Sequence, residues 1–221
     1  GNQGAVGAQG NQGAAGAQGN QGTVGADSNY ASSTTTVLFD DFSMQQTWVE
    51  AETPWILNKG NQAGCSDPTV TPTFGGRVLL VTDDTASRDV SKDGCQIVGA
   101  GEWKVSQGNL VFEASVRFST DVLNKQVCVG FTDNTALEMP ASVSGTTITT
   151  NFSDGCVFVY DTASTEAAPD QWYCVGVAGN VDATGNGISG VAPTAGTFQV
   201  LRIEIDSLNV ARFYIDGVLV K

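Results

Sequence analysis

The sequence predicts an all-β domain, an antiparallel sandwich of two sheets, preceded by a stalk of three intertwined chains. Glycine occupies every third position of residues 1–27. From residue 37 onward, short β-rich stretches alternate apolar and polar residues between Gly, Asp, Asn, Pro and Ser. No window of 12 residues shows a 3.6-residue apolar period. We therefore expect a stalk at 1–27, a neck at 28–36 and a sandwich at 37–221.

The glycine repeat has one strong physical explanation. Three chains in the polyproline II conformation wind about a common axis, where only glycine fits. The nine triplets also form three near-copies of a nine-residue unit, GNQGAVGAQ, GNQGAAGAQ and GNQGTVGAD. A flexible linker is the alternative, but it has no reason to keep glycines in register. The predicted axial residues are Gly1, Gly4, Gly7, Gly10, Gly13, Gly16, Gly19, Gly22 and Gly25.

The composition of the repeat predicts a helix that is marginal by itself. It has no proline, which usually pre-sets the collagen backbone, and no charge before Asp27 that could align the chains. The rod would be about 80 Å long at about 3 Å per residue. Since the chain starts in frame at Gly1 without an initiator Met, we expect the stalk to continue upstream.

Charge and composition exclude several function classes. The chain has 10 basic and 23 acidic residues, a net charge of −13, which disfavours nucleic acid and anionic membranes as partners. No apolar run approaches the roughly 20 residues that span a bilayer. Histidine is absent, which removes triads with a His base and His-ligated zinc.

Five cysteines form no CxxC pair, which argues against a zinc ribbon or a redox motif. Cys128, Cys156 and Cys174 lie in apolar strand-like runs, which predicts small buried side chains. Cys65 and Cys95 lie in loop-like contexts and could pair in an oxidising compartment. The sequence leaves that pairing open.

The two segments each resemble a known family. The repeat resembles the collagen-like repeats of bacterial and bacteriophage surface proteins. The closing FQVLRIEIDSLNVARFYIDGVLV, with VLFDDFS, TWVE and WKVSQGNLVFEASVRFST, resembles concanavalin A-like lectin and glucanase domains. The resemblance implies a jelly-roll sandwich over residues 37–221. It also implies one or two further strands after Lys221, or a final strand supplied by a neighbour.

In the lectins of that family, aromatic side chains stack on sugar rings. This implies that some aromatic residues of the chain bind glycan. Trp172 and Tyr173 are adjacent, so in a strand they point to opposite sides, and we expect one in the core and the other outward. The alternative is that tryptophans in a sandwich are core residues. The candidates are Trp55, Trp103, Tyr160, Trp172 and Tyr173.

The glucanases of the family carry E-x-D-x-x-E on one strand, and this chain has no such motif. The carboxylates at Glu102, Glu113 and 204–206 are single or wrongly spaced. We therefore expect no enzymatic activity. The alternative is a glycan depolymerase whose carboxylate pair comes from separate strands.

The loop at 179–188 places oxygen-bearing side chains at alternate positions, as in the first half of a calcium loop. The terminal bidentate Glu is missing, because Val191 takes its place. The competing interpretation is a plain Gly/Asn turn. The candidate Ca²⁺ ligands are Asn180, Asp182, Thr184 and Asn186.

Together, the two resemblances imply a homotrimeric fibre on a virion, such as a bacteriophage head or tail fibre or decoration protein, or on an extracellular appendage. The expected partners are other copies of the chain, cell-surface glycans, and capsid, tail or filament proteins. We expect no nucleic acid and no membrane insertion. Two alternatives stay open: the depolymerase, and a purely structural trimer organiser or anchor.

Overall fold

The computed structural model describes residues 55–59, 66–70, 78–81, 94–99, 109–119, 121–123, 125–134, 136, 138–162 and 170–221. The chain divides into the units Gly1–Val37 and Leu38–Lys221, and every described residue belongs to the second. The predicted stalk and neck lie outside the described residues.

The described residues form strands joined by turns, and every strand pairing is antiparallel, so the all-β prediction is confirmed for this part of the chain. No helix among these residues could cross a bilayer. The strands are β1 (Trp55–Lys59), β2 (Ser66–Val70), β3 (Val78–Val81), β4 (Cys95–Gly99), β5 (Leu110–Val116), β6 (Gln126–Thr132), β7 (Ala141–Ser144), β8 (Thr147–Thr150), β9 (Gly155–Asp161), β10 (Tyr173–Ala178), β11 (Val181–Asp182), β12 (Gly187–Ile188), β13 (Gln199–Ile205), β14 (Ala211–Ile215) and β15 (Val218–Leu219).

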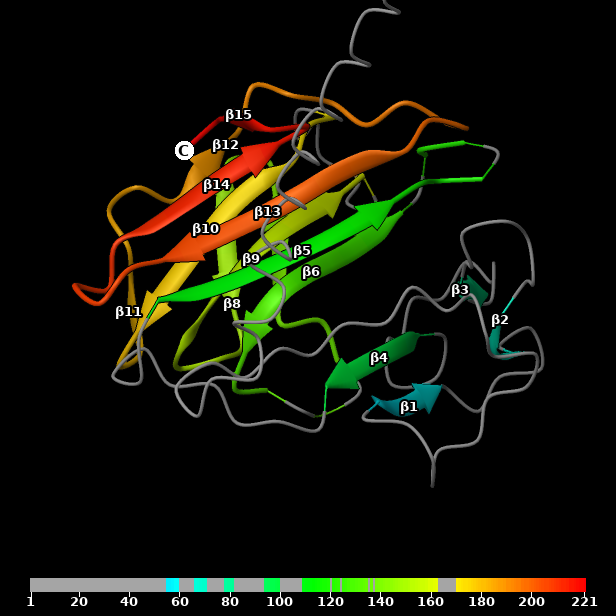
Figure 1. Ribbon diagram of the computed structural model, residues 1–221, viewed down its shortest axis with the longest axis horizontal. Coiled ribbons are helices and arrows are strands. Elements are labelled where there is room, and N and C mark those ends of the chain that lie inside the picture. Colours follow the sequence, from blue (N-terminus) through cyan, green and yellow to red (C-terminus); the bar gives the residue numbers. More distant parts are fainter. Residues whose placement is uncertain are drawn as a thin grey trace, which may run out of the picture. The chain divides into compact units, whose positions relative to one another are not determined.

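Two of the sheets contain the main core of the domain (Figure 1). One has the order β15-β14-β13-β5, and the other has the order β11-β10-β9-β6, with β12 also paired to β10. Strand β13 alternates as its sequence predicts, with Leu201, Ile203 and Ile205 buried and Arg202 and Glu204 on the other side. The buried side chains of β13 and β14 meet those of β9 and β10 in one apolar cluster.

The second sheet is covered on its other face as well. The β7–β8 hairpin packs there, and Ala141 and Val143 join Val157, Val159 and Val175 in a second apolar cluster. Strand β9 is therefore buried on both faces, in agreement with its uninterrupted apolar run CVFVY. Strands β1 and β4 form a separate pair, as do β2 and β3.

Gly130 in β6 marks a close approach between strands. A Cβ there would lie 2.4 Å from the Cys156 carbonyl oxygen and 2.8 Å from Ile203 Cδ1. The backbone φ of Gly130 is +147°, which L-residues rarely adopt. Glycine at this position thus allows β6 to lie against β9 and β13.

Gly130→Ala should destabilise the domain by about 3 kcal/mol, because the new methyl group meets backbone atoms and the φ angle becomes strained. Gly185→Ala is the control, since no heavy atom outside the chain neighbours lies within 4 Å of a Cβ placed there. The free energy of unfolding comes from urea titration followed by tryptophan fluorescence. Equal midpoints for the two variants would contradict the close approach.

Candidate functional site

Three of the aromatic residues predicted to bind glycan lie in the core. Tyr160 and Trp172 are fully buried, and Tyr173 is 2% exposed. Stacking on a sugar needs an exposed ring face. The prediction that these three rings present a glycan-binding surface is therefore corrected. Trp55 opens β1, with a side chain outside the described set, and Trp103 also lies outside the described residues.

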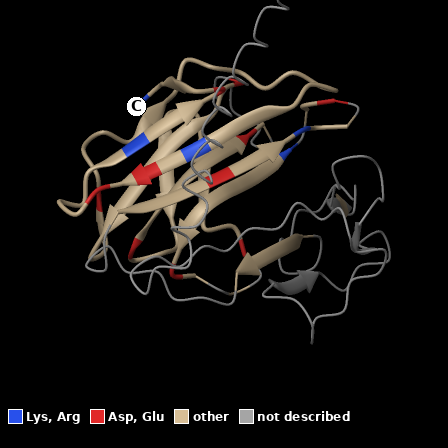
Figure 2. Cartoon of the chain, viewed as in Figure 1, with Lys and Arg blue, Asp and Glu red and all other residues tan. Residues whose placement is uncertain are grey.

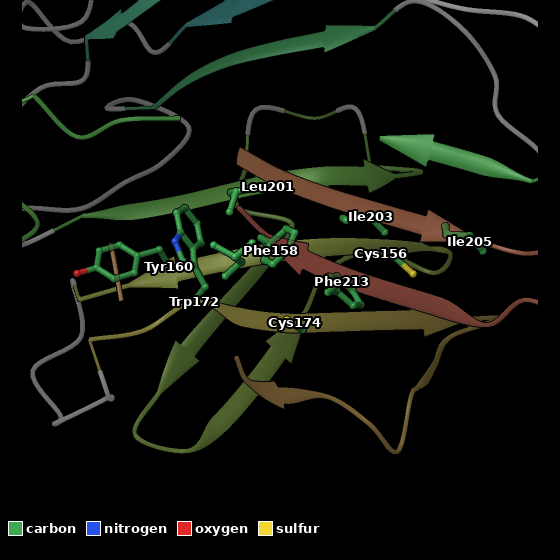
Figure 3. Close-up of a cluster of buried hydrophobic side chains, with 10 residues drawn as sticks. Cys156, Phe158, Tyr160, Trp172, Cys174, Leu201, Ile203, Ile205 and Phe213 are labelled. Atoms are coloured by element: carbon green, nitrogen blue, oxygen red, sulfur yellow. The ribbon is translucent and has the colours of Figure 1, made fainter. Parts of the chain in front are cut away.

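Trp172 forms the centre of an aromatic group between the two main sheets (Figure 3). Its ring centroid lies 5.5 Å from that of Tyr160 and 6.2 Å from that of Phe158. The indole N–H donates to Gln199 Oε1 at 2.9 Å, and the Tyr160 hydroxyl donates to the Val122 carbonyl at 3.1 Å. The indole nitrogen of Trp172 and the hydroxyl of Tyr160 thus form hydrogen bonds within the domain.

Trp172 and Tyr173 do point to opposite sides of their sheet, since Trp172 belongs to the core between the main sheets and Tyr173 to the cluster under the β7–β8 hairpin. The prediction that one of them points outward is wrong. The β7–β8 hairpin covers the face on which Tyr173 would have been exposed. The Tyr173 hydroxyl donates to the Gly145 carbonyl in the hairpin turn at 3.2 Å.

A cluster of polar loops at one end of the second sheet is the best candidate site. The loop after β6, the loop before β9 and the β10–β11 turn contact one another there. Backbone N–H groups of Asp133 and Asn180 donate to the Asp154 and Ser153 carbonyls at 3.1 and 3.0 Å. Asp154 Oδ1 accepts from the Gly179 N–H at 2.9 Å. These long-range bonds fix the loops against one another.

The loop after β6 and the loop before β9 line an open hollow with a polar wall. Its lining residues are Asp133, Asn134, Ala136, Asn151, Phe152 and Ser153. The Asn134 amide nitrogen donates to Glu138 Oε1 at 2.6 Å and to the Asn151 carbonyl at 2.9 Å. The Asn151 amide nitrogen donates to the Met139 carbonyl at 3.1 Å. These amide donors are thus used internally, and Asn134 Oδ1 likewise accepts from the Ala136 N–H at 2.9 Å. The acceptor that can take further hydrogen bonds is the Asp133 carboxylate, because each carboxylate oxygen has two lone-pair sites.

Asp133 is held in its charged form. Burial acts to raise the pKa of its carboxyl, but hydrogen bonds outweigh that effect and lower the pKa below the ordinary 3.8. The Ser153 hydroxyl donates to Asp133 Oδ2, and the Ser153 N–H donates to Oδ1 at 3.0 Å. The hollow therefore keeps a carboxylate at neutral pH. A carboxylate is a strong acceptor for hydroxyl donors.

The sequence patterns do not reveal this hollow. The segments FTDN and NFSDG that form it are typical turn sequences, and their composition gives no sign that they meet. The one indication of a polar site in the sequence is the number of Asp, Asn and Ser residues directly after β6 and directly before β9. Their contact follows from the register of β6 and β9, which pairs Thr132 with Gly155.

The candidate calcium loop is not arranged as a set of free ligands. Asn186 Oδ1 accepts from the Gly176 N–H at 2.7 Å, and its amide nitrogen donates to the Gly176 carbonyl at 3.1 Å. Asp182 Oδ1 accepts from the Thr150 hydroxyl at 3.2 Å, while Thr184 is exposed. Asn180, with φ +63°, occupies the β10–β11 turn. Among the described residues, no three Cys, Asp or Glu side chains are placed to hold a metal ion.

The carboxylates considered for hydrolysis belong to an ion-pair network. Arg202 Nη1 lies 3.3 Å from Glu113 Oε2, and Arg202 Nη2 lies 2.6 Å from Glu204 Oε1. The Tyr214 hydroxyl also donates to Glu204 Oε2 at 3.2 Å. One guanidinium thus joins Glu113 and Glu204, and this contact accounts for their proximity. Glu102 lies outside the described residues.

The thiols in the strands are core groups. Burial raises the pKa of Cys128 and Cys174 to about 12 and that of Cys156 to about 11. Cys156 and Cys174 are buried, and Cys128 packs against the cluster under the hairpin. The prediction of small buried side chains is confirmed for Cys156 and Cys174, whereas Cys128 is half-buried. The pairing of Cys65 with Cys95 involves a residue outside the described set.

Comparison with known protein families, with curated proteins and with solved structures gave no match.

Asp133→Asn should make the stability of the domain less dependent on pH below about 3.8. The pKa of Asp133 is lowered in the folded chain, so its contribution is present above the ordinary pKa and is lost as the pH falls through the folded pKa. Urea unfolding of both chains between pH 2 and 6 measures this. Asp182→Asn, in the adjoining strand β11, is the control. Parallel pH profiles for the wild type and Asp133→Asn would contradict the prediction.

Proposed function

We propose that this protein is a homotrimeric fibre protein of a virion or a cell-surface appendage, in which the β-rich domain attaches the fibre to a glycan. The observation that carries the proposal is the run of nine Gly-X-Y triplets ahead of a β-rich domain. A rod of three chains suits a domain that must be held away from a particle surface.

We further propose that the β-rich domain is a jelly roll of the concanavalin A-like type. Consecutive hairpin strands β13, β14 and β15 beside β5, packed on a second antiparallel sheet, support this assignment. The resemblance of the closing strands to concanavalin A-like domains also supports the assignment.

The polar hollow is the proposed attachment point. A sugar presents several hydroxyl donors, and the hollow offers the Asp133 carboxylate, which accepts hydrogen bonds. Phe152 also lines the hollow, although it is 6% exposed. Without a broad exposed ring, contact with a sugar would depend on hydrogen bonds. We expect weak single-site binding, strengthened by three copies on one rod.

The rod can be tested in the intact chain. Gly13→Asp places a side chain on the axis of a triple helix, whereas Ala15→Asp changes a neighbouring position that faces outward. Light scattering should give three times the chain mass of 22.9 kDa for the wild type and Ala15→Asp. Gly13→Asp should lose the polyproline-type circular dichroism signal. A wild type with the mass of one chain would overturn the proposal.

Attachment can be tested by filling the hollow. Ala136→Trp adds a bulky ring to an exposed lining residue, and Ser207→Trp places the same ring in the β13–β14 turn, which does not line the hollow. Glycans that bind the wild type on an array should bind Ala136→Trp at least tenfold more weakly, about 1.4 kcal/mol, with Ser207→Trp unchanged. Docking to particles without any glycan binding would favour a structural anchor.

A further inference from the structure

The outward face of the β15-β14-β13-β5 sheet, here called the outer face, carries a more balanced set of charges than the chain as a whole. Arg117, Arg202 and Arg212 are the arginines of the described residues, and all three lie on or beside its strands. In Figure 2, basic and acidic segments lie side by side on β5, β13 and β14. The chain as a whole carries a net charge of −13.

Two of the three arginines on the outer face are paired with carboxylates. Arg202 contacts both Glu113 and Glu204, and Arg212 Nη1 lies 3.0 Å from Asp206 Oδ2. The register places Glu113, Arg202 and Tyr214 in one row across the sheet. Three arginines thus balance three carboxylates, with Asp216 in the β14–β15 turn at the margin.

Large apolar side chains are also exposed on the outer face. Val111 is 54% exposed beside Glu204, and Leu219 is 56% exposed beside Tyr214. Phe198 is 41% exposed under the guanidinium of Arg117, which lies 5.0 Å from its ring centroid. A mixture of aromatic, aliphatic and arginine side chains is typical of protein–protein interfaces.

We propose that the outer face is the surface through which copies of this domain contact one another in the trimer. Two chains of charge −13 repel each other, so they approach best through surfaces where the charges cancel. The loop cluster, with Asp133 and Asp154, and the adjoining strand β11, with Asp182, are acidic and would repel their equivalents. A second copy is thus the partner that fits the near-neutral outer face.

The inference rests on the proposed trimer, because the rod would supply the local concentration. Tethered domains meet at an effective concentration of roughly millimolar for short flexible linkers. A face with modest exposed apolar area can then associate, although free domains at micromolar concentration would not. The contact would also stabilise a stalk that has no proline and no charge before Asp27, and that is expected to be marginal by itself.

Val111→Lys and Val181→Lys form a matched pair for the test in the intact chain. Each places a lysine at an exposed valine of a strand, Val111 on the outer face and Val181 on β11 of the other sheet. Circular dichroism and urea unfolding verify the fold of each variant. Ser115→Lys is a second variant on the outer face if Val111→Lys does not fold. Light scattering measures the mass, and sedimentation velocity measures how compact the particle is.

Three chains per particle, with a sedimentation coefficient that falls by about a tenth in Val111→Lys and stays constant in Val181→Lys, would support the contact. A mass that falls to one chain in Val111→Lys would also support it and would show that the domains hold the trimer. A trimer with equal coefficients for all chains overturns the contact and leaves the fibre proposal standing. A wild-type monomer at every concentration overturns both.

Discussion

The described structure depends on the burial of β9 on both faces. One side of this strand meets β13 and β14 in the main core, and the other side meets the β7–β8 hairpin. An antiparallel strand that is covered twice cannot shift by one residue without moving both clusters. Its register with β6 in turn brings the loops at Asp133 and Ser153 together. The position of the polar hollow therefore follows from a packing constraint in the core.

The same constraint explains why Tyr160, Trp172 and Tyr173, which were expected to include exposed rings, all lie in the core. Alternation predicts correctly that Trp172 and Tyr173 lie on opposite sides, but it assumes that one side of the sheet faces solvent. The uninterrupted apolar run CVFVY in β9 indicates that both faces of this sheet are buried. A continuous apolar run indicates burial without saying what provides the cover. The cover is the short, polar-looking hairpin that contains Ala141 and Val143.

The antiparallel all-β class and the inward set of β13 could be predicted, because Leu201, Ile203 and Ile205 alternate with Arg202 and Glu204. The hollow could not, because residues 133 and 153 meet through the pairing of distant strands. The Arg202 network was equally hidden, since Glu113 is 89 residues away along the chain. Local patterns specify which way a side chain points, and pairing register specifies what it meets.

The core thiols have a consequence for how the domain responds to acidity. The chain has no histidine, and Cys128, Cys156 and Cys174 keep their protons until far above neutral pH. Neither kind of group therefore changes its charge between about pH 5 and 8. Movement from an open medium into an acidified compartment would therefore leave these core thiols uncharged. The apolar clusters that contain these thiols thus gain no charge from the acidification that titrates histidine in other proteins.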